Sequence, residues 1–160
     1  MNNRQVNLNE ILNPTLIDLN LMAHNRKESI EALADLLSAD QRISDKEVFI
    51  EDVLAREAVE TTNMGIGVAI PHGKSSAVLR NSIAIGRVTH PMDWDPYKGE
   101  KQVTVIFLLA VRDDAEKDKA HLEMISKVAT LLVKEAFLDV LFKTNSKQDL
   151  LENIFKLIGE

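Results

Sequence analysis

The chain has 160 residues, 45% of them hydrophobic, which is enough for one compact domain over residues 1–160 that buries roughly two-thirds of its unfolded surface. The formal net charge of −6 and the dispersed basic residues argue against a nucleic-acid partner, and the absence of cysteine excludes disulfides, thiolate metal sites and cysteine catalysis. A polar N-terminus and the lack of an apolar run of about 18 residues predict a cytoplasmic protein without direct membrane insertion.

Two helices are predicted in the first part of the chain. Asn25 and Glu28 form a capping pair in "NRKESIEALADLLS", where the following apolar residues recur at helical spacing. Ser44 and Glu47 form a second capping box ahead of "VFIEDVLAREA". The second helix should end near Glu57.

The apolar period then changes from helix to strand. "GVAIP" is a short β-branched stretch closed by a proline, "SIAIGRV" alternates, and "VTVIFLLAV" is a continuous apolar run typical of a central strand buried on both faces. Helical spacing returns from about residue 115 to 132 and again in "EAFLDVLFK" and "QDLLENIFKLI". Helices on both sides of a block of strands predict an α/β sandwich in which helices cover a sheet.

The segment "GIGVAIPHGKS" differs by one residue from a nucleotide-binding loop. A P-loop has the pattern G-x-x-x-x-G-K-[ST], whereas five residues separate Gly67 from Gly73 here. The element before the segment is a predicted helix instead of a strand, and Pro71 has no amide hydrogen for a phosphate. We therefore expect no nucleotide cofactor.

The same segment places His72 directly after Pro71. The proline fixes φ at the strand exit and Gly73 lets the chain fold away, so we expect the imidazole to stand exposed at the edge of the sheet. A histidine that only caps the strand end is the alternative. Metal binding by the four histidines is not expected, because no pair of them has ligand spacing.

Four other residues have ordinary explanations when each is taken alone. Arg56 would be an ordinary cation in the C-terminal turn of a helix, where it interacts favourably with the helix dipole. His121 would be a half-buried histidine at the margin of a helix's apolar stripe. Thr61 and Thr62 suit a turn, although a hydroxyl close to His72 would orient the ring or bind phosphate. Only convergence of these side chains would make a site.

Two groups of residues match a known pattern. The first group is Arg56-Glu57, Thr62, Gly65, Gly67, Ala69, Ile70, Pro71 and His72, continued by Gly73-Lys74. The second is "FLLAV" followed on the next helix by His121-Leu122. With these residues the chain resembles, over nearly its whole length, the enzyme IIA domains of the fructose and mannitol branch of the bacterial phosphoenolpyruvate-dependent sugar phosphotransferase system (PTS).

The resemblance implies a mixed central sheet, no cofactor and a phosphocarrier function. His72 would take a phosphoryl group from the phosphohistidine of HPr and pass it to an enzyme IIB, with His121 and Arg56 stabilising the group and Thr61 and Thr62 in support. This branch uses a cysteine-type enzyme IIB, and since the chain has no cysteine, enzyme IIB would be a separate chain or domain. We therefore expect the two histidine rings to lie within about 10 Å of each other, with Arg56 beside them.

Two positions depart from the family pattern. Asn63 stands where relatives often have glycine, and with the change at Ile66 the two departures would leave one hydrogen bond to phosphate or partner missing. Ile66 stands where relatives often have a polar residue, and together with Met64 and Val68 it predicts an apolar docking patch around His72.

Two other functions stay open. One is a regulatory enzyme IIA relative of the nitrogen type, whose phosphorylation state controls a partner protein. The other is an acidic α/β binding domain without chemistry, against which the combination of His72, His121 and Arg56 argues. The resemblance places sugar recognition in the membrane subunit, so the sugar is not encoded in this chain.

Overall fold

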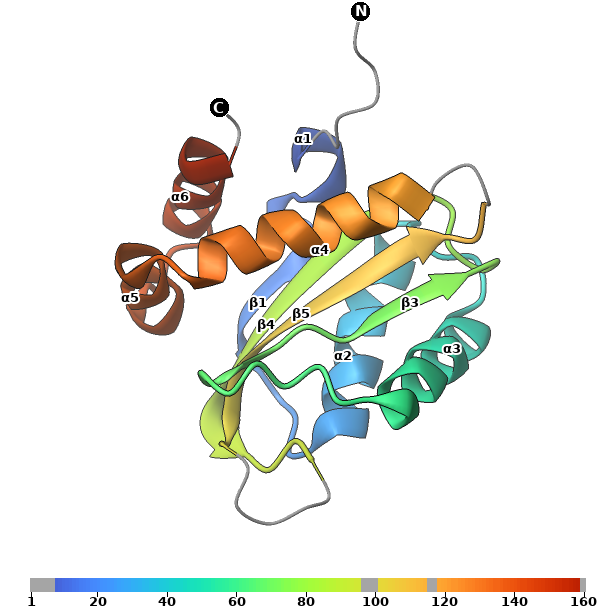
Figure 1. Cartoon of the computed structure of the whole chain (residues 1–160), viewed down its shortest axis with the longest axis horizontal. Helices are drawn as coiled ribbons and strands as arrows, with labels where there is room; N and C mark the ends of the chain where they lie inside the picture. The colour runs from blue at the N-terminus through green and yellow to red at the C-terminus, as the bar shows by residue number, and fades with distance from the viewer. Residues whose placement is uncertain (1–7, 96–100, 115–117, 159–160) are drawn as a thin grey trace, which may run out of the picture.

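The computed structural model describes residues 8–95, 101–114 and 118–158 and is an α/β sandwich built on one five-stranded mixed sheet (Figure 1). β1 runs parallel to β4, β4 antiparallel to β5, and both β2 and β3 parallel to β5. The predicted fold class and the central position of β5 are therefore confirmed. The strands are β1 (Ile17–Leu21), β2 (Val68–Ala69), β3 (His72–Ser75), β4 (Ser82–Met92) and β5 (Val103–Arg112).

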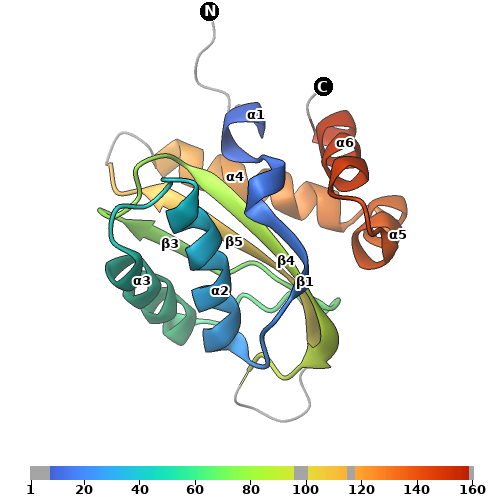
Figure 2. The ribbon, with the colours of Figure 1, turned by 180° about the vertical axis from the view of Figure 1, so that it is seen from behind.

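Helices cover both faces of the sheet. The helices α2 and α3 lie on one face, and α4, α5 and α6 lie on the other, as the front and back views show (Figures 1 and 2). Within the described residues no helix is long and apolar enough to cross a membrane. The helices are α1 (Leu8–Ile11), the 3-10 turn η1 (Pro14–Leu16), α2 (Arg26–Ala39), α3 (Lys46–Val59), α4 (Asp118–Leu132), α5 (Glu135–Lys143) and α6 (Lys147–Ile158).

The alternation of side chains along β5 divides the interior into two cores. Phe107 and Leu109 pack with the apolar residues of α4, α5 and α6, whereas Ile106 and Leu108 pack with those of α2 and α3. All four are essentially inaccessible to solvent. A strand buried on both faces needs apolar residues at every position, which explains the continuous run predicted from the sequence.

Of the two helix caps predicted in the first part of the chain, one was wrong, and the helix start predicted near residue 115 lies outside the described residues. The Asn25 side chain accepts from the Glu28 amide at 2.8 Å, as expected for an N-cap. At α3 the predicted cap Ser44 was wrong, because Asp45 accepts from the Val48 amide and the Ser44 hydroxyl donates to the Ala77 carbonyl. The helix α3 also extends to Val59, two residues beyond the predicted end. The strand β1 was not predicted.

The strand that contains "GVAIP" does not end at Pro71. Because proline has no amide hydrogen, the strand is interrupted between β2 and β3. The Pro71 carbonyl nevertheless accepts from the Leu109 amide at 3.0 Å, and pairing with β5 resumes at His72. The prediction that the chain folds away at Gly73 was therefore wrong.

Gly73 instead allows α3 to pack directly on β3. A Cβ atom at this position would lie 2.6 Å from Val53 Cγ2 and 3.3 Å from Phe49 Cε1, and Val53 and Phe49 are both fully buried. The glycine is needed for close approach, whereas Gly65 and Gly67 are needed for their positive φ angles of 80° and 89°.

We expect Gly73→Ala to lower the free energy of unfolding by about 1–3 kcal/mol, because the new methyl group overpacks the interface between α3 and β3. Urea denaturation measures the change. Val53→Ala makes room for the methyl group, so the two substitutions together should cost at least about 1 kcal/mol less than the sum of the single ones. Strict additivity would contradict the close approach.

Candidate active site

The rings of His72 and His121 lie side by side although 49 positions separate them in the sequence. Their centroids are 5.2 Å apart and their planes are inclined by 59°. His72 begins β3 and His121 lies in the first part of α4. Because side chains alternate along a strand, Gly73 meets α3 and His72 meets α4 on the opposite face. The predicted convergence of the rings is confirmed.

His72 is buried, with 5% of its surface exposed. The prediction of an exposed imidazole at the sheet edge was therefore wrong. It assumed that the strand ended at Pro71, whereas β3 continues past His72 and α4 brings His121 against the ring. His121 is half-buried, as its place at the margin of the apolar stripe predicted.

A backbone hydrogen bond fixes which nitrogen of His72 carries the proton. The distance from His72 Nδ1 to the Ile70 carbonyl oxygen is 2.9 Å. A carbonyl oxygen only accepts, so Nδ1 must donate its N–H and, in the neutral ring, Nε2 holds the lone pair. An attack by the neutral ring would therefore use Nε2.

The surroundings of His72 favour its neutral form. Burial lowers the pKa of the imidazole below its usual value of 6.5, and the positive charge of Arg56 lowers it further. The hydrogen bond to Ile70 and the charge of Glu57 act in the opposite direction without reversing the shift. The ring is therefore uncharged at neutral pH, the state in which it is a nucleophile.

Arg56 lies in the last turn of α3, and its charge acts on the His72 ring. One guanidinium nitrogen, Nη1, donates to the Glu60 carbonyl at 2.8 Å. That bond satisfies a carbonyl at the end of the helix and holds the side chain in place. The explanation of Arg56 as a cation at the C-terminal end of a helix therefore applies, and the same side chain acts electrostatically on His72.

Glu57 is a site residue that the sequence motif contained but to which no role was assigned. Its buried carboxylate accepts from the Thr61 hydroxyl at 3.3 Å, the Thr62 hydroxyl at 2.8 Å and the Thr62 amide at 2.7 Å. Trp94 Nε1 donates to the same carboxylate at 2.9 Å. Both threonine hydroxyl protons are thus directed to Glu57.

Asn63 forms hydrogen bonds within the protein, whereas the residues of the predicted apolar patch differ in their exposure. The side-chain nitrogen Nδ2 of Asn63 donates to the Asp95 carboxylate and to the Lys101 carbonyl, each at 2.9 Å. Met64 and Ile66 are 42% and 36% exposed, as expected for an apolar patch. Val68 was wrongly placed in that patch, because β2 buries it in the core that contains the apolar residues of α4, α5 and α6.

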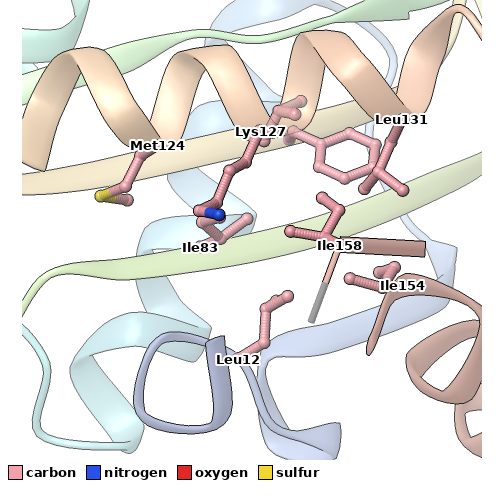
Figure 3. A pocket seen from close by; sticks show the side chains of 9 residues that line it. Leu12, Ile83, Met124, Lys127, Leu131, Ile154 and Ile158 are labelled. Carbon is pink, nitrogen blue, oxygen red and sulfur yellow. The ribbon is translucent and has the colours of Figure 1, made fainter. Parts of the chain in front are cut away.

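The other histidines and the apolar cavity lie apart from this pair. His24 is exposed at the start of α2, 3.1 Å from Glu28, and His90 is exposed on β4. Among the described residues no three His, Asp or Glu side chains gather to hold a metal ion. None of the candidate site residues lines the cavity between α4, α6 and the sheet (Figure 3). Its lining is Leu12, Ile83, Phe107, Met124, Lys127, Val128, Leu131, Ile154 and Ile158.

The direction of the His72 pKa shift gives a pH prediction. The unfolded chain binds this proton more tightly, so the stability contributed by neutral His72 is present above about pH 6.5 and is lost as the pH falls through the lower folded pKa. In an NMR titration we expect a His72 midpoint below about 6.5, and a midpoint near 6.5 for the same residue in urea. A folded midpoint above the urea value would contradict burial as the main cause.

Comparison with known proteins places the chain in a family. Residues 10–157 match the family model described as "Phosphoenolpyruvate-dependent sugar phosphotransferase system, EIIA 2". The chain is 30% identical over 133 residues to the fructose-specific PTS EIIA component of Haloferax volcanii, covering 83% of this chain and 84% of that protein. It is 32% identical over 130 residues to the 2-O-alpha-mannosyl-D-glycerate-specific PTS EIIABC component of Escherichia coli K12. That match covers 81% of this chain and 20% of the relative, so the chain spans a fifth of that protein's length.

Solved structures have the same fold. The nitrogen regulatory protein IIA-Ntr from Neisseria meningitidis superimposes with a TM-score of 0.80 at 29% identity, over 91% of this chain and 97% of that one. The mannitol enzyme IIA in its complex with phosphorylated mannitol enzyme IIB from Escherichia coli gives a TM-score of 0.76 at 20% identity, over 91% and 97%. The chain belongs to the fructose and mannitol type of enzyme IIA domains of the phosphoenolpyruvate-dependent sugar phosphotransferase system.

Proposed function

We propose that this chain, acting as a single enzyme IIA domain over residues 1–160, carries a phosphoryl group on Nε2 of His72. The observation that carries the proposal is the contact of the His72 and His121 rings, with His72 held in the Nδ1–H form. The group would come from the phosphohistidine of HPr and pass to an enzyme IIB of a sugar permease. Membership of the PTS enzyme IIA family supports both partners.

The transfer requires no base, because the nucleophilic nitrogen already has its lone pair. Nε2 of His72 attacks the phosphorus, a new N–P bond forms, and the P–N bond of the donor phosphohistidine breaks with its electron pair remaining on the donor ring. The proton on Nδ1 stays in place throughout. Its hydrogen bond to the Ile70 carbonyl strengthens as the phosphorylated ring becomes cationic.

His121 and Arg56 are proposed to stabilise the transferring group. The His121 ring is in contact with the His72 ring, so a donor nitrogen on it would reach oxygens of a group on Nε2. Arg56 supplies a full positive charge that already acts on His72. The Thr61 and Thr62 hydroxyls support the site through Glu57, to which both donate.

The separate enzyme IIB is supported by composition and by the structural comparison. The chain has no cysteine and therefore no cysteine-type enzyme IIB of its own within its 160 residues. The mannitol enzyme IIA of the same fold is described in complex with phosphorylated mannitol enzyme IIB. Met64 and Ile66, which are exposed and follow Thr62 in the motif that leads to His72, are the apolar residues proposed for transient docking of both partners.

The second candidate is a regulatory carrier of the nitrogen type. It is favoured by the superposition on IIA-Ntr at 29% identity. The two functions share acceptance of the phosphoryl group and differ in the fate of that group. Transfer from the phosphorylated chain to a sugar-specific enzyme IIB distinguishes them, since a regulatory carrier would retain the label in the presence of enzyme IIB and sugar.

Incubation with phosphoenolpyruvate, enzyme I and HPr should place one phosphoryl group per chain on His72. NMR should show linkage to Nε2, and the bond should be labile in acid and stable in alkali, as a phosphoramidate is. His72→Ala should abolish labelling, and the exposed His24→Ala should leave it unchanged. Labelling by ATP without HPr, or label on Ser75 in the His72→Ala protein, would overturn the proposal.

His121→Ala and Arg56→Ala should each slow transfer by about 10²- to 10³-fold, the scale seen when one charge-stabilising donor is removed. His72 remains as the acceptor in both variants, so labelling should still reach completion at long times. Rapid-quench measurement of the first turnover gives the rates. A variant that transfers at the wild-type rate would remove its residue from the proposed site.

Ile66→Asp should slow transfer from HPr while leaving the fold intact, because a carboxylate would replace apolar contact area at the docking surface. Leu157→Asp is the matched control, since Leu157 on α6 has the same 36% exposure. Transfer rates over a range of HPr concentrations should show a raised apparent KM for Ile66→Asp only. Equal rates for the two variants would place docking elsewhere.

A further inference from the structure

The Glu57 carboxylate is surrounded by hydrogen-bond donors. It is 3% exposed and accepts from four groups, namely two hydroxyls, one backbone amide and one indole N–H, contributed by Thr61, Thr62 and Trp94. The Thr62 amide and the Trp94 indole can only donate, so Glu57 Oε2 accepts from both. The side chain is therefore held in place by two obligatory donors and two hydroxyls.

A chain of hydrogen bonds connects this carboxylate to the ring of His72. The Thr62 amide donates to Glu57 at 2.7 Å, and the Thr62 carbonyl accepts from the Ile70 amide at 3.1 Å. The Ile70 carbonyl in turn accepts from His72 Nδ1 at 2.9 Å. Glu57 thus holds Thr62, Thr62 holds Ile70, and Ile70 determines which nitrogen of the ring is protonated.

We propose that Glu57 is a positioning residue that holds His72 in the Nδ1–H tautomer through Thr62 and Ile70, an inference that rests on the phosphoryl-carrier function proposed above. The segment from Thr62 to Ile70 includes Gly65 and Gly67 at positive φ, and Ile70 lies between β2 and β3 in neither strand. Because Ile70 follows the paired residues Val68 and Ala69 and lies outside the strand, the bond from its amide to the Thr62 carbonyl helps to keep its own carbonyl in one place.

The position of this carbonyl decides whether His72 can react. If the Ile70 oxygen moves away, Nδ1 loses its acceptor, and the tautomer with the proton on Nε2 becomes available. In that tautomer Nε2 has no lone pair, so the ring cannot attack phosphorus through the nitrogen proposed for transfer. A rotated ring would instead offer Nδ1 and form the other phosphohistidine isomer.

Trp94 connects Glu57 to the segment between β4 and β5 by a hydrogen bond. It is buried among the residues that pack under α2 and α3, and its N–H points to Glu57. It is also the only tryptophan in the chain, so its indole N–H gives a single NMR signal that reports on the Glu57 carboxylate. The signal provides a check that a Glu57 variant has changed the intended contact.

The test compares Glu57→Ala, Glu57→Gln and Glu51→Ala. The first removes the anchor. The second keeps the shape and lets the amide donate to the Thr62 hydroxyl, which can reverse and accept, so it should restore most of the function. The third removes an exposed glutamate of the same helix α3 and serves as the control.

In ¹⁵N spectra of the imidazole rings, the wild type, Glu57→Gln and Glu51→Ala should show His72 with the proton on Nδ1. Glu57→Ala should show a second tautomer, a first-turnover rate about 10- to 100-fold lower, and some phosphoryl group on Nδ1. A folded Glu57→Ala protein with the wild-type tautomer, linkage and rate would overturn the proposal. So would a loss in Glu57→Gln as large as that in Glu57→Ala.

Thr62→Val provides the test if Glu57→Ala does not fold by circular dichroism. It removes one donor to Glu57 with little change in volume, and should slow transfer about three- to tenfold with a detectable second tautomer. A wild-type tautomer and rate in Thr62→Val would then overturn the proposal. Failure of the proposed function is recognised separately, because the wild-type protein would then remain unlabelled whichever tautomer its spectrum shows.

Discussion

The hydrogen bond from His72 Nδ1 to the Ile70 carbonyl is the contact on which the chemistry of the site depends, because it assigns the lone pair of the neutral ring to Nε2. Pro71 makes this bond available. It interrupts the strand, so that Ile70 lies outside both β2 and β3 and its carbonyl meets the ring two residues later. The interruption of the strand at Ile70 and Pro71 thus also orients the proposed nucleophile.

The sheet and its two helical layers bring the remaining groups to this ring. On one side, the missing side chain of Gly73 lets α3 approach β3, which places Arg56 and Glu57 in the last turn of the helix close enough for both charges to act on His72. On the other side, α4 brings His121 into contact. Burial between these layers lowers the pKa of His72, so the packing of the two layers also keeps the imidazole in its neutral form.

Local sequence signals predicted the features of the fold that depend on residues close together in the sequence. The cap at Asn25 and the doubly buried strand β5 result from such signals, and the motif matched to the family pointed to the histidine pair. The burial of His72 could not be predicted in this way, because it depends on the approach of α4 from far along the chain. Ser44 and Asp45 are equally suitable caps by type, and a distant carbonyl, that of Ala77, decides between them.

Asn63 shows why a departure from a family pattern cannot be interpreted from the pattern alone. Its side-chain carbonyl accepts from the Gly65 amide, and its amide nitrogen donates to Asp95 and to the Lys101 carbonyl. Glycine has no side chain to make these bonds. The turn that contains Thr62 is therefore tied to the connection between β4 and β5 at three points, Asp95 and Lys101 through Asn63 and Trp94 through Glu57. Since the same turn holds Ile70, the orientation of His72 depends on a loop that lies later in the sequence and shares no motif with it.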